Sequence, residues 1–198
     1  MKDQTMQDLY IEQLRDLYDA ERQIIKALPK MIHAASSAEL KQALEEHLEV
    51  TKEQEQRIAQ IFENRGEKVK AQKCKGMEGV LKEGAELVEK GWEEAVLDAA
   101  IIAGAQRVEH YEMAGYGCAR TYAELLDDEN AAELLQKTLD EEKEANDKLS
   151  ELAETINANA IGGGEDSEQE AESEEESGVR RGEGIRKTGT SNRKRSAA

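Results

Sequence analysis

The sequence predicts an all-α protein built as a four-helix bundle, and three observations lead to this prediction. Ala, Leu, Glu, Lys and Gln are abundant, whereas the 198 residues include one Pro, one Phe and one Trp. This composition suits long helices and offers little to a β-sheet. Four long stretches repeat apolar residues at spacings of three and four, the period of an amphipathic helix. A glycine-containing segment, 66–90, separates the second stretch from the third.

Residues 5–35 form the first predicted helix, and residues 38–64 form the second. Ser36 and Ser37 lie between the two and offer side chains that can cap a helix. The apolar stripe of the first helix contains Tyr10, Leu14, Leu17, Glu21, Ile24, Leu28 and Met31. The stripe of the second contains Leu40, Leu44, His47, Thr51, Gln54, Ile58 and Ile61.

The third predicted helix, 91–126, is rich in alanine and apolar on more than one side, and the fourth covers 129–158. The stripe of the fourth contains Leu135, Thr138, Glu142, Ala145, Leu149, Leu152 and Ile156. Segment 66–90 holds a short helical pattern, MEGVLKEGAELVEKG, and is long enough to cross the bundle. Helices two and three would then run the same way, which is the ferritin-like arrangement. A plain up-and-down bundle with a long loop remains the alternative.

Composition changes at residues 162–164, which are all glycine, so we predict a folded domain over 1–160 and a disordered tail over 161–198. The tail is acidic in EDSEQEAESEEESG and then basic, with hardly an apolar residue, and cannot bury enough surface to fold. The net charge of −17 argues against a folded surface that binds nucleic acid. The basic end of the tail could contact phosphate weakly, or the tail could serve only to keep the protein in solution.

The sequence also favours a cytoplasmic protein. The N-terminus has no apolar signal core, and no apolar run approaches the ~20 residues of a membrane span. Two cysteines are too few for a disulfide framework. Lysines on both sides of Cys74 predict a lowered thiol pKa, whereas Cys118 is expected to fill a buried position.

Five ionisable residues interrupt the apolar stripes near the middle of their helices: Glu21, His47, Glu109, Glu112 and Glu142. Each alone could be a boundary residue or a satisfied core side chain, but every long helix contributes at least one. Glu109 and Glu112 lie ~60° apart on the helix, so both can point into the same interior. Four carboxylates would balance two divalent cations, and oxygen with imidazole ligands suits iron or manganese. The sequence therefore predicts a di-metal site.

Four segments, in order DLYDAERQIIKALPKM, HLEVTKEQEQRI, QRVEHYEMAGYG and TLDEEKEANDKL, resemble the YciE/YciF family of bacterial ferritin-like stress proteins. The resemblance covers about residues 5–158, and EHYEMAGYG is its most specific part. It implies a ferritin-like bundle, a di-metal centre, a tendency to dimerise and a link to stress responses, with no established substrate.

The sequence departs twice from the wider ferritin-like pattern, as in rubrerythrin, which has Glu-x-x-His on the second and fourth helices. Leu44 precedes His47 by three residues, and Ala145 follows Glu142 by three, so one carboxylate and one imidazole are missing. Glu46, Gln54 or water could replace them. His110 lies ~100° from Glu109 and is expected to face away from the site. Tyr111, Tyr116 and Tyr122 could lie near enough to it for hydrogen bonds or radical chemistry, but core packing with a solvated hydroxyl is the expectation for each.

Two functions of different kinds remain open, and the sequence does not decide whether the protein is an enzyme. One is a di-metal protein acting on oxygen or peroxide. The other is a metal-free bundle acting as a structural or interaction protein in the stress response. A homodimer is also predicted, because apolar surface on the third helix and on the connector would otherwise be exposed to solvent. That connector face contains Met77, Val80, Leu81, Leu87 and Val88.

Overall fold

The described residues form five α-helices and no β-strand, which confirms the all-α prediction. The computed structural model describes residues 4–182, with side chains described up to residue 161. The helices are α1 (Met6–Ala34), α2 (Ala38–Asn64), α3 (Lys75–Val88), α4 (Glu94–Leu125) and α5 (Glu129–Gly182). Every helix of this part of the chain is too short or too polar to span a bilayer.

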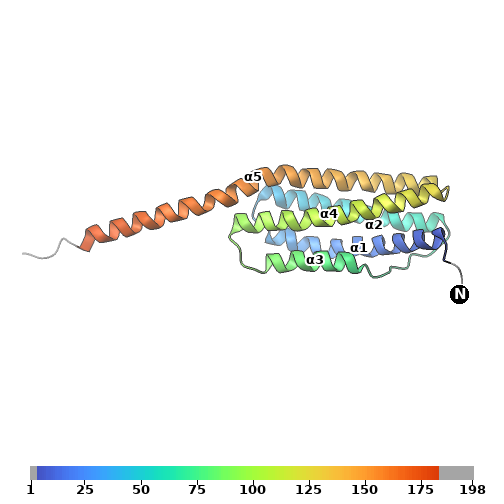
Figure 1. Ribbon diagram of the computed structural model, residues 1–198, viewed down its shortest axis with the longest axis horizontal. Coiled ribbons are helices and arrows are strands. Elements are labelled where there is room, and N and C mark those ends of the chain that lie inside the picture. The colour runs from blue at the N-terminus through green and yellow to red at the C-terminus, as the bar shows by residue number, and fades with distance from the viewer. Residues whose placement is uncertain (1–3, 183–198) are drawn as a thin grey trace, which may run out of the picture. The chain divides into compact units, whose positions relative to one another are not determined.

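The helices alternate in direction along the chain, with α3 placed on the outside of the longer helices (Figure 1). Helices α1 and α2 are antiparallel, whereas α2 and α4 run the same way. The connection between α2 and α4 therefore returns along the length of the molecule, and α3 lies within it. Helix α3 packs against both α1 and α4, so this connection is part of the packed structure and not a loose loop.

Local side-chain chemistry explains where the helices begin and end. Thr5 caps α1, because its hydroxyl accepts the Asp8 N–H at 3.2 Å while the Asp8 carboxylate accepts the Thr5 N–H at 2.9 Å. The Ser37 hydroxyl caps α2 by accepting the Leu40 N–H at 3.3 Å. Gly66, after α2, and Gly91, before α4, have φ angles of +68° and +71°, a region that favours glycine.

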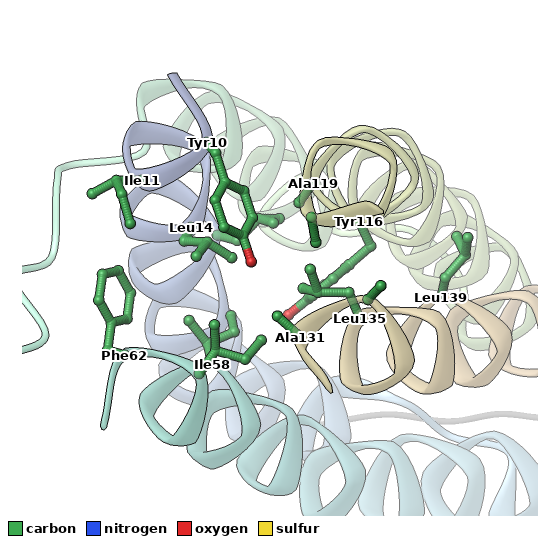
Figure 2. Packing of buried hydrophobic residues seen from close by; sticks show 14 residues of the cluster. Tyr10, Ile11, Leu14, Ile58, Phe62, Tyr116, Ala119, Ala131, Leu135 and Leu139 are labelled. Atoms are coloured by element: carbon green, nitrogen blue, oxygen red, sulfur yellow. The ribbon is translucent and has the colours of Figure 1, made fainter. Parts of the chain in front are cut away.

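The core of residues 1–160 consists of two apolar clusters. The first combines buried side chains of four helices, among them Leu14 from α1, Ile58 from α2, Tyr116 from α4 and Leu135 from α5 (Figure 2). The second is built from buried residues that include Ile24, Leu28, Leu40, Leu44, Ile101, Ile102, Val108, Leu149 and Ile156. In each of the four long helices, the ionisable stripe residues lie between members of the two clusters. The polar centre is therefore enclosed by apolar packing at both ends.

The chain divides into two units, 1–160 and 161–198, which we describe separately. Helix α5 continues through 161–182 of the second unit, where the sequence predicted a disordered tail. This segment contains glutamate, alanine and glutamine, which favour helices even without an apolar face to bury. The remaining tail residues, 183–198, with most of the basic block, lie outside the described residues. A contact of that block with phosphate stays a prediction.

Asp98 connects α4 to the turn between α1 and α2. Its carboxylate is buried, and its two oxygens accept the backbone N–H groups of Ser36 at 2.7 Å and Ser37 at 2.8 Å. These N–H groups have no partner within a helix at this position, so the carboxylate satisfies donors that the turn would otherwise leave unpaired. The side chain thereby ties α4 to the start of α2.

We expect Asp98→Ala to lower the free energy of unfolding by about 2–3 kcal/mol, because hydrogen bonds to a charged acceptor are lost. Asp147→Ala, at an exposed position of α5, is the matched control and should change stability by less than about 0.5 kcal/mol. Urea unfolding followed by circular dichroism measures both. Equal stability of the two variants would show that the turn does not depend on Asp98.

Candidate metal centre

Five ionisable side chains from four helices reach the interior between the two apolar clusters. Glu21 comes from α1, Glu109 and Glu112 from α4, and Glu142 from α5, and none of the four is more than 2% exposed. His47 comes from α2, and its side chain is 11% exposed. Because each lies on the apolar stripe of its own helix, burying the stripes brings all five residues inward.

Four of these residues form a tight group. One ligand atom from each of His47, Glu109, Glu112 and Glu142 can be chosen so that all four atoms lie within 4.8 Å of one another. His47 Nε2 lies 3.4 Å from Glu109 Oε1. This separation is small enough for one cation to contact several of them, given the 2.0–2.2 Å metal–ligand distances typical of nitrogen and oxygen donors.

Glu21 of α1 is linked to this group through α4. The Tyr116 hydroxyl donates a hydrogen bond to Glu21 Oε1. Burial and the charge of Glu142 raise the pKa of Glu21 well above its ordinary value, although the Tyr116 hydroxyl and the nearby Glu112 carboxyl act in the other direction. Because the charge of Glu142 acts on Glu21, Glu21 belongs to the same polar centre as the other four residues.

Mutual repulsion perturbs the whole cluster. Burial, followed by the neighbouring carboxylates, raises the pKa of both Glu109 and Glu112 well above the ordinary range. Burial lowers the pKa of His47, because the imidazolium loses its hydration, although the charge of Glu142 partly opposes this. Without a compensating cation, the centre therefore favours protonated carboxyls beside a neutral imidazole.

Unpaired oxygens show how well the residues fit a metal. Five buried carboxylate oxygens have no hydrogen-bond partner among the described residues, namely Glu21 Oε2, Glu109 Oε2, both oxygens of Glu112, and Glu142 Oε2. The buried Nε2 of His47 likewise makes no hydrogen bond. Buried polar atoms are normally paired, so this concentration of free acceptors at one place indicates a site suited to a cation.

Gln54, which the sequence offered as a replacement for a missing ligand, takes part in the centre through Glu142. It is fully buried on α2, one face-repeat beyond His47, and its amide nitrogen donates hydrogen bonds to Glu142 Oε1 and, at 3.2 Å, to Glu141 Oε2. Glu46, the other side chain considered for this role, is exposed and accepts a hydrogen bond from Gln42 at the surface. Gln54 therefore orients Glu142, whereas Glu46 takes no part.

A buried ion pair between Arg57 and Glu141 lies next to the Gln54–Glu142 contact. Arg57 is 7% exposed, and its two terminal nitrogens bind the two oxygens of Glu141 at 2.8 and 3.1 Å. Arg57 also donates to the Thr138 hydroxyl. This bidentate pair joins α2 to α5 one residue before Glu142 and fixes both helices in the register that Gln54 requires.

The structure places the remaining candidates as follows. Tyr116 is part of the centre through Glu21, and Tyr111 contacts Cys74 and Asp16. Tyr122 is a partly buried member of the first apolar cluster. His110 is exposed, with its Nδ1 2.8 Å from the Gln106 carbonyl oxygen, which confirms that it faces away.

Both predictions about the cysteines are wrong. Cys74 is buried at the start of α3, so burial raises its pKa; the flanking lysines have no comparable effect. Its thiol donates to Asp16 at 3.1 Å and contacts the Tyr111 hydroxyl. Cys118 is exposed on the outer face of α4. Neither environment could be read from the sequence neighbours, because other helices create the first and the rotation of α4 sets the second.

The roles of Arg57 and Glu141 were not predicted from the sequence. A weak signal existed, because Arg57 follows Gln54 by three residues and Glu141 directly precedes Glu142. Spacing alone could not pair them, since the contact depends on how α2 and α5 are aligned.

Comparison with known proteins identifies the family of the chain. Residues 5–161 match the family described as a domain of unknown function, DUF892. Protein YciF of Escherichia coli (strain K12) is 46% identical over 154 residues, which cover 77% of this chain and 93% of YciF.

Solved structures are similar as well. The E. coli stress protein YciF has a TM-score of 0.75 at 45% identity, with 79% of this chain and 98% of that one covered. YcfI of Rhodopseudomonas palustris, proposed there to be a structural protein, has a TM-score of 0.73 at 46% identity over 75% and 95% of the two chains. A Xanthomonas campestris protein at 18% identity, with a TM-score of 0.66, shares the fold alone.

The family match covers most of the chain, and the similarity to YciF extends over 154 residues at 46% identity. The chain therefore belongs to the DUF892 family of YciF-like proteins.

Proposed function

We propose that residues 1–160 are a ferritin-like four-helix bundle that binds two divalent metal ions, iron or manganese, at Glu21, His47, Glu109, Glu112 and Glu142. The observation that carries the proposal is the group of five buried carboxylate oxygens without hydrogen-bond partners among the described residues. The crossover between α2 and α4 supports the ferritin-like topology. The relation to the E. coli stress protein supports a role in the stress response.

Charge balance explains why two ions suit the centre better than one. Four carboxylates with a neutral imidazole carry four negative charges, which two divalent ions neutralise. A single ion would leave two buried charges, each costing several kcal/mol unless protonated. Bound there, such ions would supply Lewis-acid and one-electron redox chemistry toward oxygen or peroxide.

The chain's own residues would prepare the centre before any ion arrives. Gln54 and Tyr116 each hold one carboxylate oxygen by a hydrogen bond, on Glu142 and Glu21 respectively, and leave the second oxygen free. The apolar clusters at both ends exclude water. The centre therefore has its ligands oriented in advance, which lowers the entropic cost of binding.

A structural role without metal is the second candidate function. The proposal of a structural role for YcfI, at 46% identity, favours it. In that case, shared protons and not cations would neutralise the carboxyls. Cytoplasmic location stays a prediction under either function.

A homodimer also stays a prediction, and the structure weakens one of the two observations on which it was based. Met77, one of the five connector residues cited for it, is fully buried, and Val80, Leu81 and Val88 pack against the second cluster of the same chain. The apolar face of α3 is therefore largely used within the protomer. The exposed Trp92 and Leu125 remain available to a second copy.

We expect the purified protein to bind about two metal ions per chain. At a hundredfold excess over the dissociation constant, a bound ion adds about 2.7 kcal/mol of stability, so removing metal should lower Tm by about 5–10 °C. Elemental analysis and thermal unfolding, on protein prepared without chelator and then stripped, test this. Identical melting curves with and without iron or manganese would contradict metal binding.

Two variants on α4 test which residues bind. Glu112→Gln keeps the shape of the side chain but removes one charge and should lower the metal content, whereas His110→Gln, on the exposed face two residues earlier, should leave it unchanged. Metal-free Glu112→Gln should also melt higher than metal-free wild type, because it buries one ionisable group fewer. Equal metal loss in both variants would show that the ligands lie elsewhere.

The metal-free protein should lose stability as pH rises above about 4.5, the ordinary pKa of glutamate. The unfolded chain releases the protons of Glu21, Glu109 and Glu112 there, while the folded chain, with raised pKa values, keeps them. Each carboxyl that stays protonated only in the folded chain lowers the free energy of unfolding by about 1.4 kcal/mol per pH unit, until the pH passes its folded-state pKa.

Urea unfolding of metal-free protein between pH 5 and 8 measures this slope. Glu112→Gln should have a smaller slope, because one of the three carboxyls is gone, and the comparison cancels carboxyls elsewhere in the chain. Metal-loaded protein should instead gain affinity with pH, since ligands bind deprotonated. A metal-free protein that becomes more stable from pH 5 to 7, with the same slope in Glu112→Gln, would refute the raised pKa values.

A further inference from the structure

An apolar cavity of about 40 Å³ lies on the His47 side of the polar centre, between α1, α2, α3 and α4. Its walls include Ile24, Leu28, Leu44, Leu81, Ile101 and Val108. Among the described residues that line it, His47 and Glu109 are the only two with ionisable or polar side chains. The cavity thus joins an apolar space directly to two of the proposed ligands.

Helix α3 covers this cavity. Gly84 of α3 lies close to Gly104 of α4, since a side-chain carbon added to Gly104 would be 3.7 Å from the Gly84 Cα. The small residues let α3 approach α4, and Leu81 of α3 lines the cavity on this side. Met31, Val80 and Leu81, which line this side, are half-buried. The cavity therefore ends near the outer surface under α3.

Volume and polarity restrict what the cavity can hold. A cavity needs about 10–15 Å³ to hold one water, so 40 Å³ accommodates a molecule of a few heavy atoms. A water or a peroxide molecule in the apolar part would lose hydrogen bonds made in solvent, at a cost of roughly 1–3 kcal/mol for each group left unpaired. Apolar cavities bind apolar ligands such as xenon, and all the residues that line this one except His47 and Glu109 are apolar or glycine.

We propose that this cavity is a binding site for a small apolar molecule of the dioxygen class, held beside His47 and Glu109. This inference rests on the proposed di-metal function, because dioxygen would react only at a metal-loaded centre. It selects dioxygen over peroxide as the oxidant that reaches the centre. The cavity would concentrate dioxygen next to the ligands, while its walls disfavour polar competitors.

Xenon is the probe, because it binds apolar cavities whether or not metal is present. Crystals of the full-length protein under xenon pressure should show an anomalous peak bordered by Leu44, Ile101 and Val108. Val108→Ile adds one methylene to the wall and should lose most of the peak, whereas Val108→Ala should strengthen it. Val69→Ile, which adds the same group beside the first apolar cluster, should leave the peak unchanged.

Absence of a xenon peak in the wild type, or a peak unaffected by Val108→Ile, would overturn the proposal. A peak in protein that binds no iron or manganese would leave the cavity site standing while the metal proposal fails. In iron-loaded protein, Val108→Ile should slow the oxidation of ferrous iron by dioxygen relative to Val69→Ile, with no change in the rate with peroxide. Equal slowing with both oxidants would contradict the selection of dioxygen.

Discussion

Four carboxyl groups held in the interior of a helical protein are the constraint on which the rest of this structure depends. An ionised carboxylate away from water costs several kcal/mol unless a cation or a proton neutralises it. Glu21, Glu109, Glu112 and Glu142 share one interior and repel one another, and burial raises the pKa of the first three. The negative charge of this centre must be compensated, either by bound cations or by protons on the carboxyls.

The surrounding structure is organised to hold the carboxyls in place. The two apolar clusters close both ends of the centre, so the carboxyls cannot turn outward to solvent without opening the core. Gln54 and Tyr116 fix one oxygen each on two of them. The Arg57–Glu141 pair aligns α2 with α5. These contacts hold the carboxyl groups in fixed positions, which is what a preorganised set of metal ligands requires.

Helical periodicity was sufficient to predict which residues face inward. The stripes of 5–35, 38–64 and 129–158 placed Glu21, His47 and Glu142 inside, and the bounds of α1 and α2 agree to one residue. Periodicity gives the direction of a side chain but not its partner across the core. The Gln54–Glu142 and Arg57–Glu141 contacts could therefore not be predicted, because they depend on the axial alignment of two helices.

The surroundings of Cys74 and the segment after residue 160 show what local sequence does not decide. Lysines beside Cys74 suggested a lowered thiol pKa, but Asp16 and Tyr111, from distant parts of the chain, contact the thiol and burial raises its pKa. Disorder after residue 160 stays a prediction from charge and glycine content, and α5 continues to Gly182. In the first case tertiary burial decides the chemistry. In the second, the helix-forming residues of the segment compete with its lack of apolar surface.

Anomalous X-ray diffraction from crystals grown with manganese(II) tests the central claim most directly, because it locates ions without assuming their ligands. The account predicts two anomalous peaks among α1, α2, α4 and α5, contacted by the glutamates and by His47. Well-ordered crystals with no such peak, and with the carboxyl oxygens within hydrogen-bond distance of one another, would contradict it. They would show that shared protons, not metal ions, neutralise the centre.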